Sequence, residues 1–124
     1  MAEKPRTDQT APREPTQLVF SGSRLFTNWL TEEKVSLVFT TYQIGKIFFI
    51  GLQPDGRLSV FERSFDRCMG LTQKNNTLWM SARYQMWRFE NVLLEGQNYR
   101  GYDKLYVPMA GHTTGDADIH DIVI

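Results

Sequence analysis

The sequence predicts a mainly β protein, a fragment of a β-propeller-like fold with one short N-terminal helix. Aromatic residues make up 13% of the chain and cluster between Phe20 and Phe89. Aromatic and β-branched residues favour strands and bury large areas in a sheet. Short apolar runs alternate with turn signals along the same stretch, and one motif recurs 42 residues later. Together these observations predict repeated units of several short strands.

We divide the chain into three parts. Residues 1–17 hold three prolines among polar and charged residues, so they cannot bury enough surface to offset the entropy of ordering, and we predict a disordered tail. Residues 18–34 predict a short strand and a helix. Residues 35–124 predict the propeller-like β region, incomplete at its C-terminus.

The helix is predicted over residues 24–34. Apolar side chains between Leu25 and Leu30 recur on one helical face, and Ser23 stands where an N-cap is expected. Before it, the apolar run Leu18–Phe20 predicts the short strand.

The remaining elements follow from period-two patterns bounded by turn residues. Pro54-Asp55-Gly56 is a strong turn signal between two strands, and Pro108 marks a strand end or an edge strand. Polar loops are expected over 95–103 and 111–118. The predicted strands are 35–41, 46–52, 57–65, 68–72, 77–82, 84–90, 105–109 and 119–124.

An internal repeat defines the units. Tyr42–Ile47 resembles Tyr84–Phe89, with a shared Tyr-Gln, an apolar residue, a basic residue and a second apolar residue. Each copy follows an apolar strand, and a spacing of about 40 to 45 residues is typical of a propeller blade. The alternative is coincidence between two aromatic-rich hairpins. If the motif is a true repeat, we expect each Tyr-Gln pair to lie in the tight connection between two strands.

A third unit is begun and not finished. Arg67–Leu71 and Ile119–Val123 both look like the first strand of a blade. Propellers close with about four to eight blades, so we expect a truncated gene, a domain fragment or a broken reading frame. A strand ending on Val123-Ile124 leaves an apolar edge open, which predicts marginal folding and self-association through open strand edges.

Charge and composition exclude several classes of partner. The formal net charge is +0 and no basic stripe is visible, which argues against a nucleic-acid partner. No apolar run is long enough to span a bilayer and no signal peptide is present, so we expect no membrane partner and a cytoplasmic location. The single cysteine, Cys68, is expected to be a buried apolar residue and not a reactive thiol.

The densest polar cluster lies near the C-terminus. It consists of His112, Asp116, Asp118, His120 and Asp121. Histidine and carboxylate side chains bind divalent metals and transfer protons. We therefore name His120 and Asp121 as candidate metal ligands, to be completed by ligands from other blades. The alternative is that these side chains only cap loop backbone.

Arg67 joins Asp116, Asp118, His120 and Asp121 as a candidate ligand-binding residue. It follows Asp66 just before the corresponding first strand, so it would line the same channel of a propeller. The alternative is a surface ion pair of little energetic consequence.

Four stretches of the sequence resemble a known family. They are 37–52, 58–71, 77–81 and 113–121. The chain is similar, over about residues 23–124, to an uncharacterised bacterial family of conserved hypothetical proteins that carry a domain of unknown function, some of them linked to tetratricopeptide repeats. The resemblance implies a propeller-like fold and a longer parent chain, and it implies no activity; the cofactor is unknown.

Three function hypotheses follow. The first is a non-enzymatic binding or scaffold module for a protein or a small ligand. The alternative is a metal-assisted hydrolase or lyase with a site in the central channel. A third is a truncated chain without a function of its own. The common nucleophile, phosphate-loop and dinucleotide motifs are absent from the sequence, so it leaves open whether any reaction is catalysed.

Overall fold

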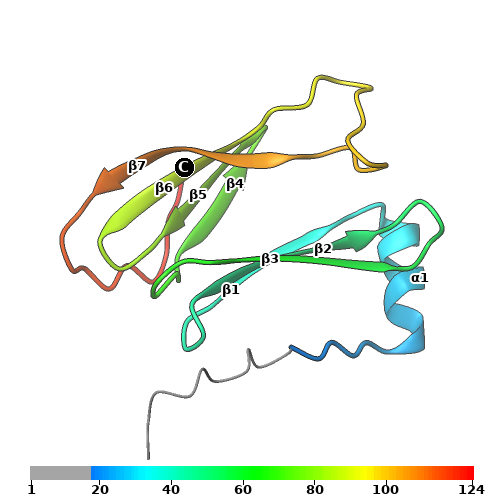
Figure 1. Ribbon diagram of the computed structural model, residues 1–124, viewed down its shortest axis with the longest axis horizontal. Helices are drawn as coiled ribbons and strands as arrows, with labels where there is room; N and C mark the ends of the chain where they lie inside the picture. Colours follow the sequence, from blue (N-terminus) through cyan, green and yellow to red (C-terminus); the bar gives the residue numbers. More distant parts are fainter. Residues whose placement is uncertain (1–17) are drawn as a thin grey trace, which may run out of the picture.

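The computed structural model describes residues 18–124, which form one helix and seven strands (Figure 1). The predicted tail, residues 1–17, lies outside the described residues. The elements are α1 (Arg24–Glu33), β1 (Leu37–Thr41), β2 (Lys46–Leu52), β3 (Leu58–Ser64), β4 (Leu71–Lys74), β5 (Thr77–Ser81), β6 (Gln85–Asn91) and β7 (Tyr106–Thr113).

The strands form two antiparallel sheets. Sheet A has the order β1-β2-β3, and sheet B has the order β4-β5-β6-β7. The prediction of a mainly β chain with one short helix is confirmed. Two open, adjacent sheets of this kind fit part of a propeller (Figure 1). No helix among residues 18–124 combines the length and apolar character that crossing a bilayer requires.

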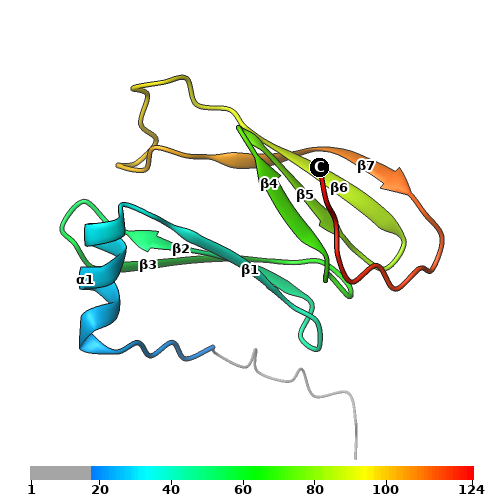
Figure 2. The ribbon, with the colours of Figure 1, turned by 180° about the vertical axis from the view of Figure 1, so that it is seen from behind.

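Two apolar clusters hold the two sheets and the helix together. The first lies between the sheets, where Ile47 of β2 packs with Leu78 and Met80 of β5, Phe89 of β6, and Cys68. The second lies on the other face of sheet A. There Leu30 of α1 covers Phe48 and Ile50, with α1 seen beside sheet A in Figure 2. Successive residues of β2 therefore point to opposite faces, and sheet A is buried on both.

The helix ends as the sequence predicts, within one residue. Lys34 adopts the left-handed conformation (φ 54°), and the Val35 N–H donates to the Leu30 carbonyl at 3.3 Å. Ser23 does occupy the N-cap position in an extended conformation, but its side chain makes no capping hydrogen bond. Packing of Leu30 therefore carries more of the stability of α1 than its caps do.

Three strand predictions were wrong. Leu18–Phe20 is not a strand, and the Phe20 ring packs edge-on against Phe48 at 5.8 Å. Residues 68–70 precede β4 and do not belong to it, because the left-handed conformation of Arg67 (φ 50°) turns the chain and directs Cys68 into the core. Residues 119–124 form no strand, and no partner strand for them exists among the described residues.

Pro108 does not end its strand. β7 continues through it to Thr113, so the polar loop expected over 111–118 begins only at Thr114. Two features explain this: β7 is an edge strand, and its register with β6 shifts between Arg88 and Phe89, opposite Pro108. A proline is tolerated where its missing N–H is not needed by a neighbouring strand.

The internal repeat corresponds to a repeated three-strand unit. Strands β1, β2 and β3 have the same antiparallel order as β5, β6 and β7. Tyr42 and Gln43 lie in the turn between β1 and β2, and Tyr84 lies in the matching turn between β5 and β6, with Gln85 opening β6. The predicted place is confirmed for Tyr42, Gln43 and Tyr84, whereas Gln85 is the first residue of β6. Both tyrosine side chains are half exposed.

Candidate functional site

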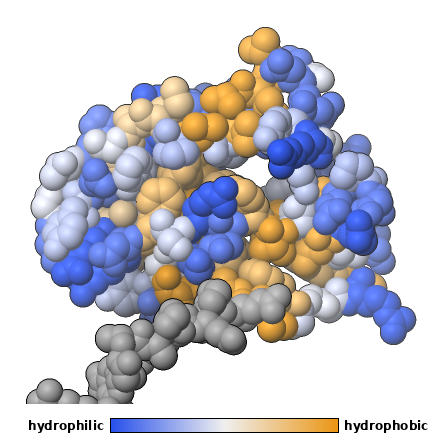
Figure 3. Space-filling view, viewed as in Figure 1, coloured by the Kyte–Doolittle hydropathy of each residue, from blue (hydrophilic) through white to orange (hydrophobic). Residues whose placement is uncertain are grey.

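Four chain segments meet at one end of the two sheets, which we call the loop end. They are residues 42–45, 65–70, 82–84 and 114–124, namely the β1–β2, β3–β4 and β5–β6 connections and the segment after β7. They lie at the left in Figure 1, and the space-filling view shows mostly hydrophilic residues there (Figure 3). The loop end therefore presents polar groups on a scaffold with a buried apolar core.

Backbone hydrogen bonds join each of these segments to the next. Phe65 N–H donates to the Gly45 carbonyl at 2.8 Å, and Arg83 N–H donates to the Asp66 carbonyl at 2.8 Å. Thr114 N–H donates to the Tyr84 carbonyl at 2.9 Å. The segments come from both sheets, so these bonds fix their side chains relative to one another.

Glycine is required at position 45 for this arrangement. Gly45 has a φ of 59°, and a Cβ atom there would lie 2.9 Å from the Phe65 carbonyl oxygen. That separation is shorter than real Cβ contacts, and the left-handed conformation disfavours other residues as well.

Five charged residues gather at the loop end, and we call them the charged cluster: Asp66, Arg67, Arg83, Asp116 and Asp118. An Nη atom of Arg67 lies 3.9 Å from a carboxylate oxygen of Asp116 and 3.9 Å from one of Asp118. Arg83 lies 3.6 Å from carboxylate oxygens of both Asp66 and Asp116. These separations exceed hydrogen-bond distance, so the guanidinium groups are balanced electrostatically without using their donors.

Arg83 is the more enclosed of the two arginines. Its guanidinium lies 5.0 Å from the ring centre of Tyr84, and its buried Nε has no hydrogen-bond partner among the described residues. The Tyr84 phenol and the carboxylates of Asp116 and Asp66 raise the pKa of Arg83. Arg83 is therefore a permanent cation at the loop end, with its side chain 34% exposed and its Nε buried.

Of the two arginines, Arg67 is the one whose guanidinium can bind a ligand. Its side chain is 39% exposed, and none of its guanidinium donors hydrogen-bonds a described residue. Its backbone holds the left-handed conformation, with a φ of 50°. Such strain in a residue other than glycine persists where the surrounding structure enforces it and is concentrated at functional sites.

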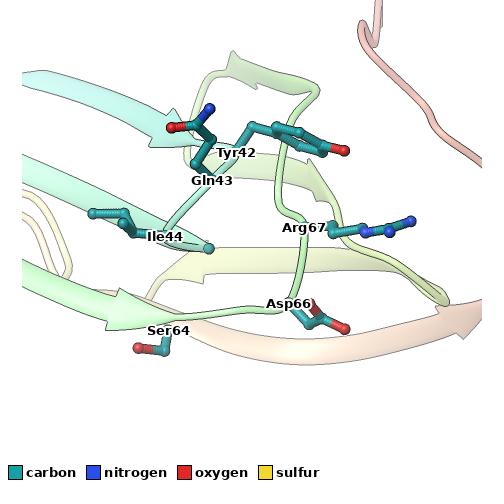
Figure 4. Close-up of a pocket in the computed structure, with 7 residues that line it drawn as sticks. Tyr42, Gln43, Ile44, Ser64, Asp66 and Arg67 are labelled. Atoms are coloured by element: carbon teal, nitrogen blue, oxygen red, sulfur yellow. The ribbon is translucent and has the colours of Figure 1, made fainter.

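Arg67 borders an open hollow of about 580 Å³. The hollow is lined by Tyr42, Gln43, Ile44, Gly45, Ser64, Asp66 and Arg67. Figure 4 shows the Tyr42 ring and the Arg67 side chain extending toward the same side, from the β1–β2 turn and the β3–β4 connection. The residues around the hollow carry an aromatic ring, a guanidinium, an amide, a hydroxyl and a carboxylate, and Tyr42 and Arg67 are the two that extend to a common side.

The structure brings together three of the five predicted ligand-binding residues. Arg67, Asp116 and Asp118 meet in the charged cluster. Asp121 accepts the Ile122 N–H at 2.9 Å, which is the capping role named as the alternative. His120 takes part in no ion pair or hydrogen bond with a described residue, and its role stays a prediction.

Sequence reasoning missed the lining residues Tyr42, Gln43 and Ser64. The repeated Tyr-Gln motif was the signal for the first two, but it was interpreted as a structural feature of the turn. Ser64 gave no signal. His112, which belonged to the predicted polar cluster, instead stacks on Trp79 with ring centres 5.8 Å apart.

The described residues provide no complete set of ligands for the predicted metal ion. Within residues 18–124, no three side chains of histidine, cysteine, aspartate or glutamate come close enough to hold one ion. A site on His120 and Asp121 still requires further ligands and stays a prediction. Cys68 is fully buried, and burial raises the pKa of its thiol, which disfavours the reactive thiolate.

A comparison with protein families gives one match. Residues 24–124, from the first residue of α1 onward, match DUF4915, a domain of unknown function. The chain belongs to this family. The predicted membership of an uncharacterised family is thereby confirmed, and both sheets and the loop end fall within the DUF4915 region.

No curated protein and no solved structure matches this DUF4915 chain. The bacterial origin and the link to tetratricopeptide repeats stay predictions. The DUF4915 description assigns no activity, so the function has to be argued from the loop end.

Proposed function

We propose that this domain is a non-enzymatic binding module, and that its loop end binds a neutral ligand rich in hydroxyl groups. One observation carries the proposal. The Arg67 guanidinium, with all its donors unused by described residues, lies beside the carboxylates of Asp116 and Asp118 and borders an open hollow that Tyr42 and Asp66 also line.

The balance of charge supports a neutral ligand. The charged cluster holds two guanidinium groups and three carboxylates, joined in four ion pairs with N–O distances of 3.6–3.9 Å. An anion would meet three carboxylates, and a cation would meet two guanidinium groups. A hydroxyl group both donates and accepts hydrogen bonds, so a polyhydroxylated ligand can use both kinds of partner without a charge conflict.

The shape and lining of the hollow agree with this class. Its volume of about 580 Å³ is in the range of small-molecule sites. The half-exposed Tyr42 ring supplies an apolar face with a polar tip, which suits the C–H and O–H surfaces of a saccharide. Gln43 and Ser64 add neutral hydrogen-bonding groups.

An array of immobilised neutral glycans, probed with the labelled chain and followed by calorimetry on any glycan retained, tests the proposal. Arg67→Ala should weaken binding by about tenfold or more, because one lost hydrogen bond to a charged group is worth about 1.5–3 kcal/mol. The matched control is Arg57→Ala. Arg57 also pairs with an aspartate in a loop, Asp55, but it lies in the β2–β3 turn and lines no part of the hollow.

The outcomes separate the parts of the proposal. Glycan binding that is lost in Arg67→Ala and kept in Arg57→Ala supports both the loop end and the ligand class. Binding of inorganic phosphate with the same dependence on Arg67 would keep the loop end and replace the ligand class by an anion. Glycan binding that both variants retain would refute the loop end as the site.

A further inference from the structure

We propose that the free edge of β1 takes an added strand, and that this strand is the segment Ile119–Ile124 of a second copy of the chain. The segment would lie antiparallel on β1, as β4 lies on β5. This segment belongs to the loop end but lines no part of the hollow, so the interaction does not depend on the proposed ligand.

The two sheets show what is missing at this edge. The repeated unit pairs β1 with β2 in the way that β5 pairs with β6. In sheet B the other edge of β5 is covered by β4, with Leu71 opposite Met80 and Lys74 opposite Thr77.

In sheet A no strand from residues 18–124 covers the corresponding edge of β1. Apart from its ladder with β2, β1 makes no backbone–backbone hydrogen bond to another described residue. An edge with unpaired N–H and C=O groups is a template for a further strand.

Ile119–Ile124 has the composition of such a strand. Four of its six residues are valine or isoleucine, which favour extended backbone. The segment forms no strand in this chain, and its last two side chains, Val123 and Ile124, are 88% and 53% exposed. Pairing with β1 would satisfy its backbone groups and bury apolar surface.

The segment Ile119–Ile124 is held too far from β1 of the same chain to pair with it. The Ser81 hydroxyl donates to the Ile119 carbonyl at 2.7 Å, and the Gly70 N–H donates to the same oxygen at 3.2 Å. Met80 points into the core between the sheets, so its neighbour Ser81 points to the opposite face of sheet B. The segment therefore starts on the face of sheet B that is turned away from sheet A.

Strand donation from one copy to the next follows from this geometry. The donated segment and the accepting edge are different surfaces, so the contact is heterologous and head-to-tail. In a linear assembly only the two end copies retain a β1 edge or a segment that another copy can use. We expect concentration-dependent oligomers and not a single closed dimer.

The test compares the full chain with Val123→Pro and Val123→Thr by analytical ultracentrifugation and amide hydrogen exchange over a concentration series. Proline removes an N–H and does not fit a ladder, whereas threonine keeps the N–H and the β-branched shape. Val123 is 88% exposed, so neither change disturbs the folded monomer, which the thermal midpoint at low concentration verifies.

The full chain should associate, and the amides of residues 37–41 should gain protection as it does. Val123→Pro should weaken association by about tenfold or more, and Val123→Thr by less than about threefold, because a ladder hydrogen bond and its neighbours are lost only with proline. A chain that stays monomeric up to about 1 mM overturns the proposal, since edge pairing of this size would be detectable there. Association with protection on β7 in place of β1, or association unaffected by Val123→Pro, also overturns it.

Discussion

Replacing Ser81 by alanine should release the segment that follows β7. Ser81 is 1% exposed, and its hydroxyl makes two hydrogen bonds: it donates to the Ile119 carbonyl at 2.7 Å and accepts the Gly70 N–H at 2.8 Å. Alanine keeps the volume nearly unchanged and removes both. The Gly70 N–H keeps its second partner, the Ile119 carbonyl at 3.2 Å, so it is not left without an acceptor.

The loss should amount to about 2 kcal/mol of unfolding free energy, because each hydrogen bond contributes about 1 kcal/mol. With a urea m-value of about 1–3 kcal/mol/M, the unfolding midpoint should fall by about 1 M. The effect should also be local. Amides of residues 116–122 should exchange faster, because the remaining ties are weak. They are the Gly70–Ile119 hydrogen bond at 3.2 Å and the ion pairs of Asp116 and Asp118 at 3.6–3.9 Å.

Urea unfolding and native-state hydrogen exchange measure both effects. Ser64→Ala is the matched control, since the Ser64 hydroxyl makes only an exposed hydrogen bond with Lys46, whose ammonium keeps its partner Glu62. It should cost less than about 0.5 kcal/mol. If Ser81→Ala unfolds at the same urea concentration as Ser64→Ala, or leaves exchange over 116–122 unchanged, Ser81 does not anchor this segment.

Three further predictions concern the core and the turns. Leu30→Ala should lower the unfolding free energy measured in urea by about 2–4 kcal/mol, because the Leu30 side chain is buried between α1 and sheet A. Leu25 lies on the same helix with its side chain 73% exposed, so Leu25→Ala should cost less than about 0.5 kcal/mol. Equal costs would refute the packing of α1 on sheet A. Gly45→Ala should cost more than Gly56→Ala by chemical denaturation, since both have positive φ but only at Gly45 would a Cβ meet backbone within 3 Å, and similar costs would mean that the β1–β2 turn adjusts freely. Cys68 should react with a thiol reagent only on unfolding. Burial raises its pKa, so the unfolded thiol ionises first and stability should fall as the pH rises above about 8.5; rapid labelling of the native chain at neutral pH would contradict its burial.

The sequence by itself determined most of the local structure. Lys46–Leu52 is a strand because its side chains are apolar on both faces, and Pro54-Asp55-Gly56 ends the hairpin because glycine and proline supply the backbone angles of a turn. The helix over Arg24–Glu33 follows from apolar residues at helical spacing. The repeated Tyr-Gln motif identified the repeated hairpin. These features depend on neighbours within a few residues, so composition and period are sufficient to predict them.

Only the tertiary structure decided where the strands differ from those that the sequence pattern predicts. Pro108 stays within β7 because that strand is at an edge, and whether a strand is at an edge depends on what pairs with it. Cys68 is not part of a strand, contrary to the prediction, because its side chain is buried in the core between the sheets. Ile119–Ile124 has strand composition but no partner strand among residues 18–124, and an extended segment without a partner gains no ladder hydrogen bonds.

The candidate site was predicted in part for the same reason. Arg67 and the aspartates Asp116 and Asp118 were each expected to face one channel, but their meeting depends on the hydrogen bonds that tie the connections of sheet A to those of sheet B. The repeated motif singled out Tyr42, but a turn tyrosine has the same sequence pattern whether it packs or borders a site, so its place in the hollow was not predicted. Contacts between residues about fifty positions apart are fixed by how two sheets pack, and a one-dimensional pattern does not contain that distance.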